Sequence, residues 1–275
     1  MIARHVASIG TAEARAAVRT RVAEGKSKFL QLTDTLPPSL EGQATVVSEA
    51  EKVRLVLKYR HPAYPGEDIV TDGSKIEIQA YPGTCFVDFS GFPICIDRSP
   101  LGFFLYNEGS AVLSGGLLEG TLSTAWPLLD PGLRGAKLIY NGLKTMNGEN
   151  LHEIQYQPRE RTDMDIRLYF HQDSYRHVLT IAKSAPRVSR PVPYRRNVPG
   201  VSGLQAAAPD SVMIYYAVVQ TFSEFKTFDG LTLPTTYEID YEAAVGDRRR
   251  LQRYINTFTN VMNNVALDPR NFQMK

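Results

Sequence analysis

The sequence predicts a mainly β protein of the α+β class, in which a curled antiparallel sheet forms a barrel-like domain. Short runs in which apolar and polar residues alternate fill most of the chain after residue 26, and tight-turn signals join many of them. The crossover helices that a parallel sheet requires are missing between these runs. A sheet of roughly ten or eleven strands must curl, because long open edges aggregate.

A helix is expected over residues 1–24, laid against the sheet. Ile2, Val6 and Ile9 recur at helical spacing, and an alanine-rich run follows Thr11, a residue suited to an N-cap. Gly10 lies between the two parts and is expected to bend the element.

The strand predictions rest on period-two alternation and on the residues between the runs. VRLVLKY (53–59) and DIRLYFH (165–171) alternate apolar with polar side chains. Asp72-Gly73, Asn147-Gly148 and Asp229-Gly230 each separate two strand-like runs, which is the strongest short signal for a hairpin.

An apolar insert interrupts the strands at residues 99–130. Ser99-Pro100 supplies an N-cap followed by proline at the first helical position. Leu118, Leu122, Ala125 and Trp126 then fall at i, i+4, i+7 and i+8, which predicts one helical face that Pro127 ends. Because the insert is apolar on more than one side, we expect it to be buried against the concave face of the sheet as a lid or plug.

Cys85 and Cys95 flank the run FVDFSGFPI. If Ser90-Gly91 marks a hairpin turn, the two cysteines lie opposite each other, within reach of a disulfide. Two buried free thiols are the alternative. The spacing does not suit zinc, so no metal site is expected.

Residues 185–211 contain five prolines and the arginines 187, 190, 195 and 196, which predicts an extended Pro/Arg-rich loop. A solvated connection is the simpler interpretation. The alternative is a basic arm that contacts anionic headgroups or an envelope protein partner.

Composition narrows the function classes. A formal charge of +2 and only one basic cluster argue against a nucleic-acid partner. The sequence contains no stretch of about 18 consecutive apolar residues, so no transmembrane segment is expected. A length of 275 residues allows one large β domain, so we expect residues 1–275 to form a single domain.

No catalytic pattern was found, and no cofactor is expected. The five histidines show no metal-ligand spacing, and neither a nucleophile elbow nor a phosphate-binding glycine loop occurs. His152 and Glu153 are strand neighbours that should face opposite sides of the sheet. His171 and His177 flank a predicted turn, and a structural cross-strand pair is the expected arrangement.

The order of elements resembles the outer-membrane lipoprotein-sorting (LolA-like) superfamily, which includes LolB, LppX and the RseB-like proteins. The resemblance is carried by HVASIGTAEARAAVRTRVAEG, GLLEGTLSTAWPLLD, FSEFKTFDGLTLPTTYEI and NTFTNVMNNVALDPRNF, which are spread over most of the chain. The resemblance implies an unclosed barrel covered by helices, around a hydrophobic cavity for acyl chains. It also implies a periplasmic location and a leader or lipid anchor that this chain lacks. The family's arginine contacts to its lid match no motif here. The residues expected to line the cavity or form the lid are Phe103, Phe104, Leu117, Leu118, Leu122 and Trp126.

Three functions follow as hypotheses. The first is a non-catalytic periplasmic carrier or transport protein that binds lipids or lipoprotein acyl chains. The second is an envelope interaction or signalling module whose own insert fills its core. The third is a hydrolase with a cryptic site.

Overall fold

The computed structural model describes residues 1–31, 39–61, 64–79, 85–87, 93–95, 100–107, 109–130, 132, 135–159, 162–189, 212–246 and 248–273. The helices are α1 (Ile2–Ile9), α2 (Ala12–Ala17), α3 (Pro100–Asn107) and α4 (Ser110–Ser114), with 3-10 helices η1 (Gly120–Leu122) and η2 (Pro269–Phe272). The strands are β1 (Thr20–Gln31), β2 (Ser39–Glu49), β3 (Lys52–Tyr59), β4 (Gly66–Thr71), β5 (Ile76–Gln79), β6 (Cys85–Val87), β7 (Pro93–Cys95), β8 (Lys137–Met146), β9 (Glu149–Gln157), β10 (Met164–His171), β11 (His177–Ser184), β12 (Arg187–Ser189), β13 (Val212–Phe228), β14 (Leu231–Val245) and β15 (Arg248–Asn263).

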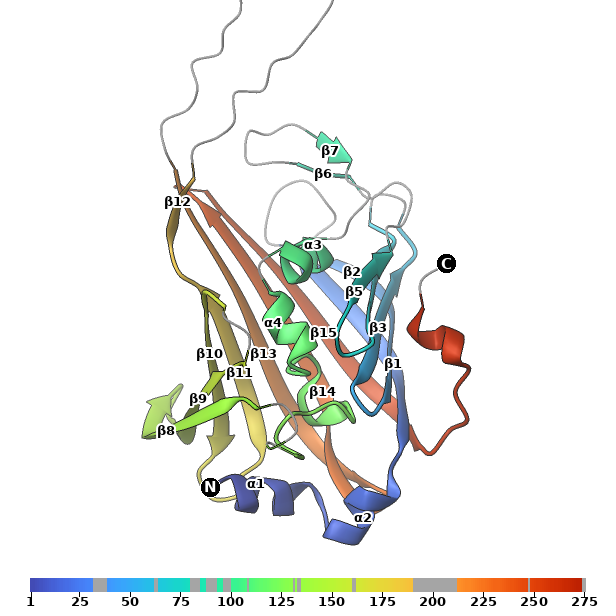
Figure 1. The fold of residues 1–275 in the computed structure, drawn as a ribbon. Helices are drawn as coiled ribbons and strands as arrows, with labels where there is room; N and C mark the ends of the chain where they lie inside the picture. Colours follow the sequence, from blue (N-terminus) through green and yellow to red (C-terminus); the bar gives the residue numbers. More distant parts are fainter. Residues whose placement is uncertain are drawn as a thin grey trace, which may run out of the picture.

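Thirteen strands form one antiparallel sheet in the order β5-β4-β3-β2-β1-β15-β14-β13-β11-β10-β9-β8, with β12 paired to β13. The sheet is strongly bent, and β5 and β8 are its two separate ends, so it does not close into a barrel (Figure 1). The remaining strands, β6 and β7, pair only with each other. The predicted fold class is therefore confirmed.

The C-terminal strands join the two halves of the sheet. β15 pairs with β1 on one side and with β14 on the other, so the end of the chain lies between its beginning and its middle. β13, β14 and β15 are 17, 15 and 16 residues long, and they make the tall central wall in Figure 1. The insert lies in front of this wall, on the concave side.

The hairpin turns form where the sequence predicts them. Asn147 and Gly148 both have positive φ, 51° and 83°, as do Asp229 and Gly230 at 48° and 79°. Positive φ at both central residues is the type I′ geometry that Asn-Gly and Asp-Gly favour. At Asp72 the carboxylate accepts hydrogen bonds from the backbone N–H of the two residues after Gly73, which fixes the β4–β5 turn.

The N-terminal helix is shorter than predicted. Gly10 separates α1 from α2 with a φ of 157° and a ψ of 178°, and Thr11 caps α2 as expected by accepting from the Ala14 N–H at 3.2 Å. The prediction that the helix continues over residues 18–24 is wrong, because β1 begins at Thr20. There the chain pairs with both β2 and β15, and two strand ladders outweigh a weak helical periodicity.

The insert also departs from its prediction. α3 begins at Pro100, as the sequence indicates, but the helix expected to present Leu118, Leu122 and Trp126 on one face is wrong. That part of the chain consists of turns and the single 3-10 turn η1. Positive φ at Glu119 and Gly120, 62° and 52°, is incompatible with a right-handed helix. The two leucines happen to follow helical spacing in the sequence, but turns in the backbone direct their side chains into the core.

Candidate ligand-binding face and its insert

The insert, residues 99–130, joins the strands in one hydrophobic core over the concave face of the sheet. Five of the six predicted lining residues are described there, and all are between 0% and 2% exposed: Phe104, Leu117, Leu118, Leu122 and Trp126. The side chain of Phe103 lies outside the described part of the structure. These residues are brought together as predicted, and their role in lining a ligand cavity stays a prediction.

Aromatic rings anchor both ends of the insert. At the α3 end, the Phe104 ring lies 5.5 Å from the Tyr241 ring and 6.1 Å from the Tyr216 ring, measured between centroids. At the other end, Trp126 stacks on His177 at 4.4 Å. Aromatic contacts at two places, one at Phe104 and one at Trp126, therefore fix the insert to the strands on either side of its irregular middle.

Trp126 is also tied to the N-terminal helix. Its Nε1–H donates to Nε2 of His5 at 2.9 Å, and Nδ1 of His5 lies 2.9 Å from the Tyr175 carbonyl oxygen. Because that carbonyl can only accept, His5 must carry its proton on Nδ1 and accept from Trp126 as a neutral ring. Burial lowers the pKa of His5 to about 4, which keeps the ring neutral at pH 7.

Arg21 of β1 holds the middle of the insert. It is 5% exposed, and its guanidinium donates to the carbonyls of Thr121 at 2.9 Å and Leu122 at 3.3 Å, and to the Asn263 side chain at 2.9 Å. Burial lowers the pKa of Arg21 to about 10, so it stays charged at neutral pH. Arg21 is thus an arginine that contacts the insert, although no motif in the sequence indicated one.

Two glutamates are fully buried, Glu67 beside the insert and Glu119 within it. Glu67 of β4 accepts from the hydroxyls of Tyr64 at 2.5 Å and Tyr254 at 3.1 Å and from the Gly102 N–H of α3 at 3.3 Å, and burial raises its pKa to about 7. Glu119 has no hydrogen-bond partner for either carboxyl oxygen among the described residues. Burial raises the pKa of Glu119 to about 8, so its carboxyl is mostly protonated at pH 7.

Sequence reasoning missed the buried polar groups His5, Arg21, Glu67, Glu119 and His177. The charged or imidazole side chains of these residues look solvent-facing when taken one at a time. Glu67 gave no local signal either, because β4 is buried at every position although it also carries Asp68 and Thr71. The contacts of the other four join segments about 100 or more residues apart or depend on the unpredicted turns at 119–122.

The expected pairing of His171 with His177 is wrong. Nδ1 of His171 lies 3.3 Å from the backbone N–H groups of Asp173 and Ser174, within its own turn. The His177 ring instead enters the core, where its Nε2 lies 2.8 Å from the Thr180 hydroxyl. The difference arises because a register shift at the end of β10 sets His177 opposite Phe170.

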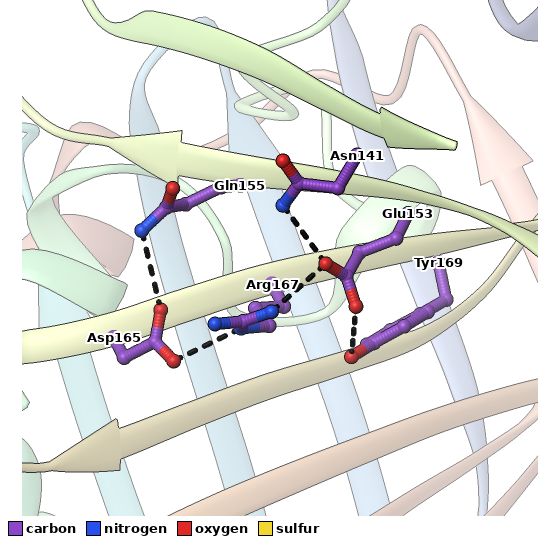
Figure 2. Close-up of polar contacts among 6 residues, drawn as sticks. All are labelled: Asn141, Glu153, Gln155, Asp165, Arg167 and Tyr169. Atoms are coloured by element: carbon purple, nitrogen blue, oxygen red, sulfur yellow. Dashed lines mark hydrogen bonds and ion pairs between the residues drawn. The ribbon is translucent and has the colours of Figure 1, made fainter. Parts of the chain in front are cut away.

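A separate polar network lies on the outer face of β8, β9 and β10 (Figure 2). Glu153 accepts from Asn141 and Arg167, both at 2.8 Å, and from the Tyr169 hydroxyl at 2.9 Å, and Arg167 also donates to Asp165 at 2.9 Å. These bonds and the charge of Arg167 lower the pKa of Glu153 despite its burial. His152 bonds to Tyr140 instead and takes no part in this network, as the predicted strand alternation requires. Each of the six residues drawn has at least one partner within the network, which suits a structural role.

Among the described residues, two pockets lie near the insert and at the end of the sheet, and the predicted lining residues belong to neither. One, of about 60 Å³, lies where the insert meets α1, α2 and β14 and includes Arg15, Arg21 and Thr121. The other, of about 300 Å³, lies at the sheet end and is lined by Met1, Arg4, Tyr140, His152 and Tyr175.

Cys85 and Cys95 are directly opposed in the β6–β7 ladder, as the hairpin interpretation requires. The predicted turn at Ser90-Gly91 lies outside the described residues, and the disulfide stays a prediction. In the Pro/Arg-rich loop, residues 187–189 form β12 instead of loop, and residues 190–211 also lie outside the described part.

In the described part of the chain, no group of three or more His, Cys, Asp or Glu side chains is placed to hold a metal ion. Within the same part, no helix is long and apolar enough to cross a membrane.

The bent open sheet with a helical insert on its concave face defines a half-barrel fold. Comparison with solved structures finds this fold in a member of the LolA superfamily. The structure is similar to that of a LolA superfamily protein from Nitrosomonas europaea, with a TM-score of 0.50 and 13% identity over 99% of this chain and 96% of that chain. Lower similarity relates it to a DUF1329 family protein from Desulfovibrio piger (TM-score 0.41, 10% identity, 99% of this chain and 95% of that chain).

An outer membrane lipoprotein-sorting protein domain from Vibrio parahaemolyticus is similar to a comparable degree (TM-score 0.42, 7% identity, 99% of this chain and 97% of that chain). The fold assignment rests on the Nitrosomonas structure. No protein-family model matches the sequence, and the comparison with curated proteins found no match either.

Proposed function

We propose that this chain is a non-catalytic carrier of the bacterial periplasm that binds lipids or lipoprotein acyl chains on the concave face of its sheet. The insert occupies that face in the closed state and leaves it when a ligand enters. The residues proposed to meet the ligand or form the lid are Phe103, Phe104, Leu117, Leu118, Leu122 and Trp126.

The observation that carries this proposal is the construction of the insert. Apart from Leu129, its described large apolar side chains are buried as deeply as any in the core, yet its backbone consists of α3, α4, η1 and turns. Each buried methylene contributes about 0.8 kcal/mol, whether it belongs to the insert or to an acyl chain. In the hydrophobic contribution alone, an acyl chain therefore replaces the apolar side chains of the insert at little net cost, while strand ladders elsewhere stay intact.

Native mass spectrometry tests the proposal directly. The full chain, purified without detergent, is incubated with dipalmitoyl phosphatidylglycerol vesicles and re-isolated. We expect a species heavier by one lipid. A protein that never acquires lipid would contradict the carrier function.

A tethered variant makes the test specific to the insert. The Thr124 N–H donates to Ser48 Oγ at 3.0 Å, so the insert and β2 are in direct contact at these two residues. The double variant Ser48→Cys/Thr124→Cys should lose lipid uptake when oxidised and regain it when reduced. The single variant Ser48→Cys is the matched control, and it should take up lipid under both conditions.

An interaction module is the second candidate, favoured by one observation. Val188 of β12 and Met213 of β13 lie opposite each other at the root of the Pro/Arg-rich loop, 63% and 49% exposed. An exposed apolar pair beside a basic segment suits a protein partner. Deleting residues 190–211 should then abolish partner binding and leave lipid uptake unchanged.

A further inference from the structure

The sheet holds the middle of the insert mainly through backbone atoms. Arg21 donates to the carbonyls of Thr121 and Leu122, at 2.9 and 3.3 Å, and the Gln220 side-chain amide donates to the Leu117 carbonyl at 3.2 Å. Three peptide carbonyls therefore accept hydrogen bonds from two strands, β1 and β13.

Two other strands accept from the insert. The Glu119 N–H donates to the Tyr237 hydroxyl of β14 at 3.2 Å, and the Thr124 N–H donates to Ser48 Oγ of β2 at 3.0 Å. The Tyr237 hydroxyl in turn donates a hydrogen bond to Gln220 Oε1 at 2.8 Å, which leaves the Gln220 amide hydrogens for an acceptor above the sheet. The side chains of residues 117–122 take no part in these bonds.

These groups of the sheet are buried deeply enough to depend on their partners. Arg21 is 5% exposed, and Gln220, Tyr237 and Ser48 are each 0% exposed. A buried donor that loses its acceptor weakens the complex by about fivefold to a hundredfold, and a charged donor by more. A plain hydrocarbon chain in place of the insert would leave the donors of Arg21 and Gln220 without acceptors.

We infer that the ligand exchanged for the insert carries amide or ester carbonyls next to its apolar chains, and that Arg21 and Gln220 recognise those carbonyls in place of the peptide carbonyls of residues 117–122. This inference rests on the proposed carrier function and names its ligand class. The acyl chains replace the leucines of the insert, and the carbonyls replace its backbone.

A series of ligands with matched chains tests the inference on the unmodified protein. N-methylpalmitamide, methyl palmitate and heptadecane are each added from the same non-ionic detergent micelles. Binding is followed by the emission of Trp126, the single tryptophan of the chain and part of the insert. We expect the amide and the ester to bind at least about tenfold more tightly than the alkane, because only they supply an acceptor.

A matched pair of variants assigns the selectivity to its residue. Gln220→Met keeps the side-chain length and removes the donor, so the preference for the amide should fall to within about twofold of the alkane. Gln252→Met changes another buried glutamine on β15, 2% exposed, and should leave the preference unchanged. If Gln220→Met does not fold, the three-ligand series on the unmodified protein decides alone.

The outcomes separate this inference from the proposed function. Equal binding of all three ligands, or tighter binding of the alkane, overturns the ligand class and leaves the carrier function standing. If none of them binds and lipid uptake also fails, the carrier function falls as well. Binding of an unacylated peptide with the sequence Leu117–Thr124, together with failure of all three ligands, would assign the face to polypeptide and overturn the inference.

Discussion

Replacing Glu119 with glutamine should stabilise the protein, and increasingly so as the pH rises. Glu119 is 0% exposed, and neither carboxyl oxygen has a partner among the described residues. Burial raises its pKa from 4.5 to about 8. Below pH 4.5 the carboxyl is protonated in both the folded and the unfolded chain, so it costs nothing. Between pH 4.5 and about 8 the unfolded chain loses the proton first, and folding then requires its uptake.

The magnitude follows from the two pKa values. At pH 7, keeping Glu119 protonated in the folded state costs about 3 kcal/mol, and above pH 8 the cost levels off at roughly 5 kcal/mol. Glutamine has nearly the same shape and polarity as the protonated acid but does not titrate. Glu119→Gln should therefore match the unmodified protein near pH 4.5 and exceed its stability by about 3 kcal/mol at pH 7.

Urea unfolding at pH 5, 6, 7 and 8, followed by Trp126 emission, measures the difference between the two proteins. The pH dependence of Glu67 is common to both and cancels. Glu153→Gln is the control with the opposite sign, since the pKa of Glu153 is lowered and its charge supports the fold. A stability difference between Glu119→Gln and the unmodified protein that does not change with pH would refute the reasoning.

Three other predictions concern Trp126, His5 and the cysteine pair. Trp126→Phe leaves Nε2 of the buried His5 without its donor, and we expect a loss of about 1–3 kcal/mol in urea unfolding. The pKa of His5 is lowered from 6.5 to about 4. The stability that neutral His5 contributes is therefore complete above pH 6.5 and is lost as the pH falls through about 4. Protonated His5 would point a second N–H donor at the Trp126 N–H. A red shift of Trp126 emission near pH 4 that His5→Asn removes would check this. Cys85 and Cys95 should resist alkylation until reduced, which peptide mass spectrometry measures, and labelling without reductant would contradict the disulfide.

The sheet was predictable from the sequence because its signals are local. Alternation over about seven residues marks a half-buried strand, and Asn147-Gly148 or Asp229-Gly230 fixes where the chain reverses. The order of strands was not predictable in the same way. β15 lies between β1 and β14, and it pairs with β1 across more than 200 residues of sequence, as Arg21 does with Asn263. No local pattern encodes such a distant partner.

The candidate site was predictable only in its apolar part. Leu118, Leu122 and Trp126 were identified as buried because they are large and apolar, although the helix expected to carry them is absent. Arg21 and Glu119 were missed because their burial depends on tertiary contacts. Arg21 meets carbonyls 100 residues away, and Glu119 is turned inward by a left-handed backbone that sequence periodicity does not reveal.

Hydrogen exchange of the insert with and without bound lipid tests most directly whether the insert and a ligand compete for the same face. In the closed protein the amides of Glu119 and Thr124 are hydrogen-bonded to the sheet and should exchange slowly. With dipalmitoyl phosphatidylglycerol bound, exchange in residues 117–126 should become faster while β13, β14 and β15 stay protected. Lipid binding that leaves these amides equally protected, or protects them further, would mean that the ligand lies elsewhere and would contradict the account.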